Sequence, residues 1–318
     1  MVFDTYLPQS FCREFVEAKN NSMQLGMYMS LVLGIKPLLD DWISVERMEI
    51  FRKACRKYRV HIRQDAIFQS CDKEEIPAHI IGSKYLTTTT AFGFHPQSGM
   101  AGQMHVFLSR EKRLLKDAMW YPVIVKDRVL FQPRADQLNY GYTLGYPRCC
   151  VNFFRRFNDW MKYSYLYEAY RNTSGEPSFM CNPFLKDSTL SYIYHMPCSY
   201  NCKATIELVA RLKKEINKRE PAYVRIVERF LKRPFLVFYE KKIYGFEGQL
   251  KGNTVRYSRV YFTSPNVTQD LYSADFAAAD SLRLEGRKIL LWRGRRLVKV
   301  IEPPLNDFAP EYPFLIQF

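Results

Sequence analysis

The sequence predicts an α+β fold in which helical N-terminal and central regions precede a small antiparallel β module. Apolar residues recur at helical spacing through most of the chain up to residue 232, and beyond it they alternate with polar residues between glycine turns. Three regions follow from these changes of pattern: 1–100, helical with a loop-rich end; 101–232, mainly helical with a cysteine and histidine cluster; and 233–318, a basic antiparallel β module.

The first region is expected to be helical over roughly its first sixty residues. Phe11 and Phe15, four positions apart, lie on one face of such a helix. Helical spacing is then lost in 67–102, which is rich in Asp, Pro, Gly and Thr and is expected to form loops. Strands are expected at 104–108 and 123–131, where β-branched residues gather.

Three prolines punctuate the central helices. Pro147 is expected in the first turn of a helix over 149–172, where its missing N–H group costs nothing. A second helix is expected to begin near Pro197, and Pro221 ends it and begins a third.

The β module begins at Pro234, where FLVFYEKKIYGFEGQL opens a run of alternating segments. Glycine-containing dipeptides and tripeptides between such segments are typical of hairpin turns. Turns are therefore expected at Glu247-Gly248, Lys251-Gly252-Asn253, Glu285-Gly286-Arg287 and Arg293-Gly294.

Five side chains that bind soft metals lie within 54 residues of the central region. Cys149 and Cys150 stand in GYPRCCVNFF, and His195, Cys198 and Cys202 stand in HMPCSYNC. Cys198 and Cys202 are four apart at the start of a predicted helix, so their sulfurs would project from one face. Helix N-termini also stabilise thiolates, which are the form that metals bind. We therefore predict a metal site from these five residues.

The adjacent pair is expected to supply one ligand. Neighbouring helical residues point about 100° apart, so Cys149 and Cys150 share one centre only if one of them precedes the regular helix. Cys150 is slightly preferred, and Cys149 would then be a thiol beside the metal. Cys181 is expected to be buried for structural reasons. The plainest alternative is that all of these are buried apolar thiols and that His195 is a core histidine.

The identity of the metal decides between two functions. Neither the usual C-x2-C spacing of zinc sites nor the ferredoxin cysteine run is present. Up to four thiolates favour an iron–sulfur cluster of [4Fe–4S] type, in an enzyme of sulfur or redox chemistry that could act on RNA. The alternative is zinc, as a structural ion in a non-catalytic nucleic-acid-binding protein. A third possibility is thiol redox chemistry without a metal.

The two cysteine motifs also resemble a known family. GYTLGYPRCCVNFF and HMPCSYNCKAT are similar to the GYP-x-CC-x-x-FF and H-x-PCS-x-x-C elements of an uncharacterised prokaryotic family, over about residues 140–210. That family is a domain of unknown function, so the resemblance implies no activity. It implies only that Cys149, Cys150, His195, Cys198 and Cys202 form one unit, outside which Cys181 lies.

Net charge indicates a polyanionic partner. The chain carries a formal charge of +15, and residues 201–302 contain 22 basic and 11 acidic residues. RNA or another polyanion could bind this basic module. A candidate binding face combines basic residues with aromatic residues that could stack on bases, although a solvated strand face is the simpler interpretation. Its members would be Tyr257, Tyr261, Trp292, Arg293, Arg295, Arg296 and Lys299.

Absent motifs weigh against P-loop nucleotide hydrolysis, simple dinucleotide oxidoreduction, and esterase and metalloprotease activity. The sequence contains no Walker loop, no G-x-G-x-x-G motif after a strand, no G-x-S-x-G elbow and no H-E-x-x-H motif. No apolar run reaches the roughly 20 residues that span a bilayer, and the first residues do not resemble a secretory signal. No membrane partner and a cytoplasmic location are therefore expected.

Overall fold

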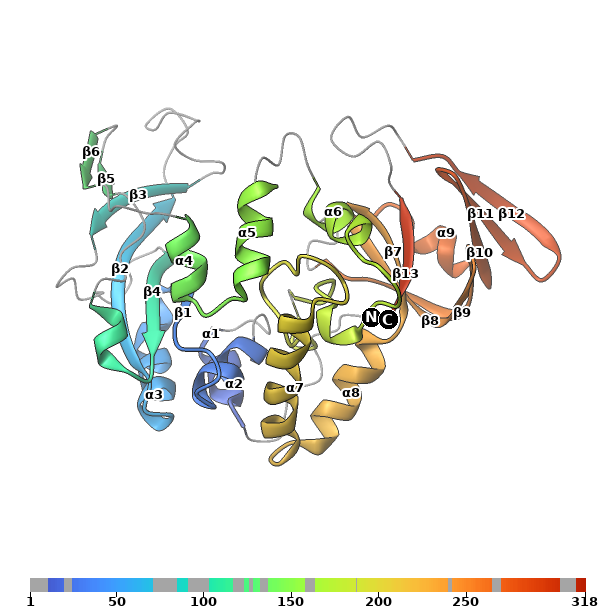
Figure 1. Cartoon of the computed structure of the whole chain (residues 1–318). Helices are drawn as coiled ribbons and strands as arrows, with labels where there is room; N and C mark the ends of the chain where they lie inside the picture. Colours follow the sequence, from blue (N-terminus) through green and yellow to red (C-terminus); the bar gives the residue numbers. More distant parts are fainter. Residues whose placement is uncertain are drawn as a thin grey trace. The chain divides into compact units, whose positions relative to one another are not determined.

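The chain forms two compact units, Ser10–Tyr146 and Pro147–Phe318, called here the N-terminal and C-terminal units (Figure 1). The predicted division at residues 100 and 232 follows changes of sequence pattern and stays a prediction. The computed structural model describes residues 11–19, 25–70, 85–90, 103–116, 123–125, 128–131, 137–157, 164–186, 188–239, 242–264, 270–303 and 313–318.

The N-terminal unit is built on a four-stranded antiparallel sheet of order β1-β4-β2-β3. Its strands are β1 (Leu39–Ser44), β2 (His61–Ser70), β3 (Tyr85–Thr90) and β4 (Gln103–Ser109), and a separate hairpin pairs β5 (Val123–Val125) with β6 (Arg128–Phe131). Its helices are α1 (Arg13–Lys19), α2 (Leu25–Val32), α3 (Met48–Lys57) and α4 (Gln137–Thr143), with short 3-10 turns η2 (Val45–Arg47) and η4 (Lys112–Leu115).

The strands predicted at 104–108 and 123–131 are confirmed. Three helices, α1, α2 and α3, lie within the first sixty residues, where helices were predicted. The strand β1 between α2 and α3 was not predicted. Likewise 67–102 is not only loop, since β2 extends to Ser70 and β3 follows at Tyr85.

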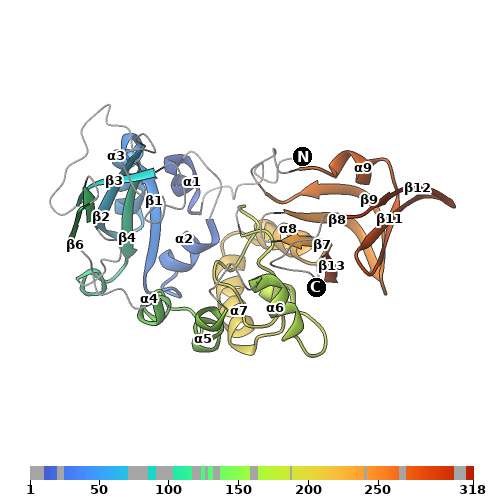
Figure 2. The same ribbon diagram turned by 90° about the horizontal axis from the view of Figure 1, so that it is seen from above.

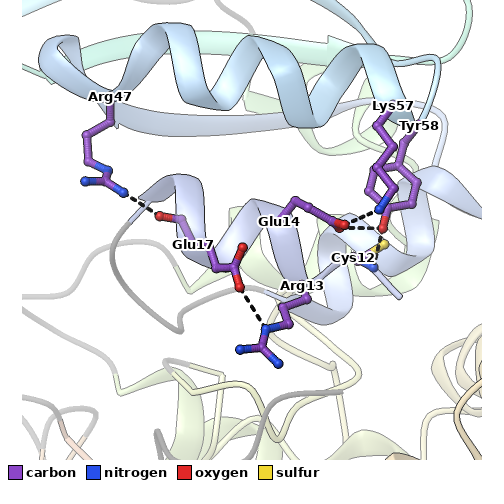
Figure 3. Close-up of polar contacts among 7 residues, drawn as sticks. All are labelled: Cys12, Arg13, Glu14, Glu17, Arg47, Lys57 and Tyr58. Carbon is purple, nitrogen blue, oxygen red and sulfur yellow. Dashed lines mark hydrogen bonds and ion pairs between the residues drawn. The ribbon is translucent and has the colours of Figure 1, made fainter. Parts of the chain in front are cut away.

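Polar contacts at both ends of α1 join this helix to the two ends of α3 (Figure 3). At one end the Tyr58 hydroxyl accepts a hydrogen bond from the Cys12 amide at 2.8 Å and donates one to the Glu14 carboxylate at 2.6 Å. Lys57 also pairs with Glu14. At the other end Arg47 donates to the Glu17 carbonyl at 2.6 Å and so satisfies a free acceptor of the last turn.

The C-terminal unit contains a seven-stranded antiparallel sheet of order β12-β11-β10-β9-β8-β7-β13. The predicted β module is thus present but is a large sheet. Its strands are β7 (Pro234–Tyr239), β8 (Lys242–Lys251), β9 (Thr254–Phe262), β10 (Ser281–Glu285), β11 (Lys288–Arg293), β12 (Arg296–Ile301) and β13 (Phe314–Gln317). The short helix α9 (Ser273–Ala277) packs its Phe276 into the core of the sheet.

Three of the four predicted turns are confirmed, and Gly252, Gly286 and Gly294 have the positive φ that such turns require. The prediction at Glu247-Gly248 is wrong. These residues form a β-bulge inside β8, where the β9 backbone approaches so closely that a Cβ atom on Gly248 would lie 2.0 Å from the Arg256 carbonyl oxygen.

The helices of this unit are α5 (Arg148–Arg156), α6 (Tyr165–Arg171), α7 (Lys203–Asn217) and α8 (Pro221–Leu231), with a 3-10 turn η5 (Phe179–Cys181). The helix predicted over 149–172 is divided, because α6 has an N-cap of its own in Ser164. The third predicted helix is confirmed as α8, with Pro221 in its first turn. Among the described residues no helix has the length and apolar character needed to cross a membrane.

Candidate metal centre

The first pair of cysteines lies in the first turn of α5. Pro147 is the N-cap residue, and its extended backbone turns the chain directly into the helix. Cys149 and Cys150 are the second and third residues of α5, so the positive end of the helix dipole lies beside both sulfurs. Cys149 is exposed, whereas Cys150 is buried.

The second pair brackets the turn before α7. The prediction that a helix begins near Pro197 is wrong: Cys198 lies in an irregular turn, and Cys202 is the N-cap residue of α7. The turn is held by the Asn172 side-chain amide, which donates to the Cys198 carbonyl at 2.6 Å, and by the Cys202 amide, which donates to the Ser199 carbonyl at 3.2 Å. Cys198 is therefore placed by loop hydrogen bonds rather than by helical periodicity.

The four sulfurs of Cys149, Cys150, Cys198 and Cys202, called here the four-thiol group, all lie within 4.8 Å of one another. The Sγ atom of Cys202 is 3.6 Å from that of Cys149 and 3.7 Å from that of Cys150. The adjacent cysteines are 3.9 Å apart, although both are helical. Both of them reach the group, where the sequence predicted one.

Comparisons with protein-family models, curated proteins and solved structures gave no match. The resemblance based on the two cysteine motifs stays a prediction. What the structure contributes is that four of its five implied residues are brought together.

His195 is not a member of the four-thiol group but is linked to it through Thr205. Its Nε2 atom is 2.9 Å from the Thr205 hydroxyl, which in turn is 3.4 Å from the Cys150 sulfur. His195 and Thr205 are both buried. The imidazole is thus linked to a thiol through one hydroxyl, an arrangement that orients a ligand and supports its charge. Sequence reasoning missed Thr205, although its place three residues after Cys202, one helical turn on, was a usable signal.

Cys181 is a fifth thiol close to the group. It is buried against Cys150 and Cys202, and its Sγ atom is 3.7 Å from the Cys202 carbonyl oxygen. Burial raises the pKa of the Cys181 thiol to about 12. These features match the structural burial expected for it.

The thiols share protons unequally. Hydrogen bonds from Cys150 and Cys198 lower the pKa of Cys202 strongly, despite the opposing effect of burial. The pKa of Cys150 is raised by its hydrogen bonds with Cys198 and Cys202 and by burial. Hydrogen bonds from neighbouring thiols therefore favour the thiolate form of Cys202, and a bound cation would replace the protons of those thiols.

The stacking face expected on the β sheet is not formed as predicted. Tyr257 and Tyr261 are only 7% and 5% exposed, and the Tyr257 hydroxyl donates to the Phe276 carbonyl at 2.8 Å. Both rings belong to the interior of the unit and cannot stack on a base. Of the three aromatic residues, only Trp292 is partly exposed.

Proposed function

We propose that the four-thiol group binds one zinc ion and that this ion stabilises the C-terminal unit. The sulfur spacing carries the proposal. Zinc–thiolate bonds of about 2.3 Å place the sulfurs of a tetrahedral site about 3.8 Å apart. The sulfurs of Cys149, Cys150 and Cys202 are 3.6, 3.7 and 3.9 Å apart, so they already outline one face of a tetrahedron of that size. The Cys198 sulfur, within 4.8 Å of the other three, would supply the fourth corner.

A structural role follows from the number and position of the ligands. Four thiolates fill a tetrahedral zinc site and leave no position for a substrate. Cys149 and Cys202 are 53 residues apart in the chain, so the ion would join the beginnings of α5 and α7. The intervening loop 172–202 has little regular structure, and cross-linking its end to a helix would restrict it.

A nucleic-acid partner for this zinc protein is supported by charge alone. The 22 basic residues in 201–302 would attract a polyanion, and affinity would then fall steeply with salt. The burial of Tyr257 and Tyr261 removes part of the aromatic surface that such a partner would use.

An iron–sulfur enzyme is the second candidate, and the open side of the group favours it. Cys149 is exposed and Cys198 is partly exposed, so a substrate could approach one corner of a cluster. Each cysteine of a [4Fe–4S] centre binds a different iron, however, which requires sulfurs farther apart than those around one ion. The observed spacing therefore favours the single ion.

Metal analysis of the full chain, purified without oxygen, tests the proposal. We expect one zinc per chain and no visible absorption. The Cys202→Ser variant should lose most of the zinc, whereas the matched Cys181→Ser variant should retain it, because Cys181 lies outside the four-thiol group. Iron with inorganic sulfide and a brown colour would support the enzyme instead. Metal-free protein with reactive thiols would favour thiol redox chemistry.

A further inference from the structure

The strand β12, at one end of the seven-stranded sheet, has one edge without a partner strand among the described residues. β12 pairs with β11 only, and no other described strand lies beside it (Figure 2). Both views place β11 and β12 at the end of the sheet farthest from α7 and α8. An edge strand presents unpaired backbone N–H and C=O groups, which are a template for another strand.

This edge is apolar as well as unpaired. Leu297, Val298 and Val300 are 42%, 44% and 42% exposed, and within β12 only Ile301 is buried. Exposed aliphatic side chains along an open edge provide the surface that a docked strand would cover.

The charged side chains of β12 and of the turn before it are all basic. Residues 293–300 contain four basic side chains and no acidic one. Lys299 pairs with Asp275 at 2.6 Å, whereas Arg293, Arg295 and Arg296 have no ion pair among the described residues. The partner that complements this segment is therefore negatively charged.

Two other occupants fit less well. Pairing β12 with β12 of a second copy would bring Arg293, Arg295 and Arg296 of both copies together, although none of these has an ion pair among the described residues of its own chain. A nucleic acid would supply negative charge, but β12 contains no aromatic residue on which a base could stack.

Protection of the edge against aggregation is the remaining explanation. Basic side chains and a β-bulge serve that purpose, and the β11–β12 pair has both. Protection does not account for the exposed aliphatic residues Leu297, Val298 and Val300, because exposed apolar residues on an edge strand favour aggregation.

We propose that β12 is a docking edge for an extended segment of a partner protein in which acidic and apolar residues alternate, added to the sheet as an eighth strand. Main-chain hydrogen bonds would provide affinity, and the basic residues would select acidic side chains. The inference makes no use of the four-thiol group, so either proposal can fail alone.

The test uses soluble, fluorescently labelled nonapeptides and the full chain. One set alternates Asp or Glu with Val, Ile or Leu, and a matched set of identical composition gathers the acids in one block. We expect at least tenfold tighter binding of the best alternating peptides than of their matched partners. Methylation of their backbone nitrogens should abolish binding.

Variants locate the binding. The double substitution Arg293→Glu with Arg296→Glu should weaken the alternating peptides at least tenfold, and Leu297→Ser with Val300→Ser should do the same. Arg211→Glu with Lys214→Glu changes charge equally at exposed positions of α7 and should have little effect. Circular dichroism checks folding of each variant.

Three outcomes would overturn the proposal. The first is equal binding of alternating and block peptides, or no binding of either. The second is unchanged binding in both the arginine variant and the Leu297→Ser with Val300→Ser variant. The third is tighter binding of oligouridine than of any peptide, weakened by the arginine substitutions, which would assign the edge to nucleic acid.

Discussion

At the scale of single residues, the main feature is the contrast between two adjacent cysteines. Cys149 is exposed and Cys150 is buried, yet both contribute sulfur to the four-thiol group. Both residues lie in the first turn of α5, where side chains tilt toward the helix N-terminus, and their sulfurs are 3.9 Å apart. The general rule of 100° between neighbours predicted one ligand, and the position at the N-terminus made room for two.

Thr205 supplies a test at the same scale. Its hydroxyl joins His195 to Cys150, and partners that orient metal ligands commonly change affinity by about 10–100-fold when lost. Thr205→Val keeps the shape and removes the hydroxyl, so we expect zinc binding to weaken within that range. Thr205→Ser retains the hydroxyl and should bind nearly as the unsubstituted chain does.

Competition with a chromophoric chelator measures both affinities, and circular dichroism confirms that each variant is folded. Equal affinity of the Val and Ser variants would show that the hydroxyl does not support the site.

At the scale of elements, α1 and α3 form a contact whose strength depends on pH. Burial acts to raise the pKa of Glu14, but hydrogen bonds from Lys57 and Tyr58 outweigh it and hold the pKa below its usual value of 4.5. A carboxyl whose pKa falls on folding contributes stability above its unfolded pKa, and this is lost as pH falls through the folded value.

Glu14→Gln should therefore lower the free energy of unfolding by about 1 kcal/mol at pH 7, given partial solvent exposure. At pH 3 and below the difference from the unsubstituted chain should shrink. Urea unfolding at both pH values measures this. Glu17→Gln is the matched control, because its ion pair with Arg13 is exposed and contributes little. A difference that does not depend on pH would contradict the account.

The elements also show which parts of the fold a single sequence can predict. Hairpins with glycine turns and the helix after Pro221 were predictable because their signals are local. β1 was not, because Asp40 and Asp41 are unusual in strands. Asp41 is accommodated there by Lys19 and Tyr28, contacts that only the folded chain reveals.

Long-range pairing explains the other omissions. β13 reads as a short apolar tail, and it becomes a strand by pairing with β7, about eighty residues earlier. The candidate metal site shows the same difference between local and long-range signals. The spacing of the cysteines predicted the four-thiol group. The position of Cys198 in a turn and the contact of His195 with Thr205 depend on the fold of the surrounding loop, which the spacing does not reveal.

At the scale of the whole molecule, one unit carries both proposals. The four-thiol group is the only cluster of close metal-ligand side chains found in the described parts of the chain, and it lies with β12 in the C-terminal unit. The group joins two helix starts, and the sheet ends in a basic apolar edge. A zinc ion that stabilises this unit would therefore also stabilise the sheet that contains the proposed docking edge β12, without contacting the partner bound there.

X-ray absorption at the zinc edge of the purified full chain tests the central claim most directly. A single tetrahedral ion held by Cys149, Cys150, Cys198 and Cys202 predicts four sulfur neighbours at about 2.3 Å and no lighter neighbour in the first shell. A nitrogen neighbour would contradict the account by placing His195 on the metal. So would the absence of zinc together with an iron spectrum in which further iron atoms surround each iron.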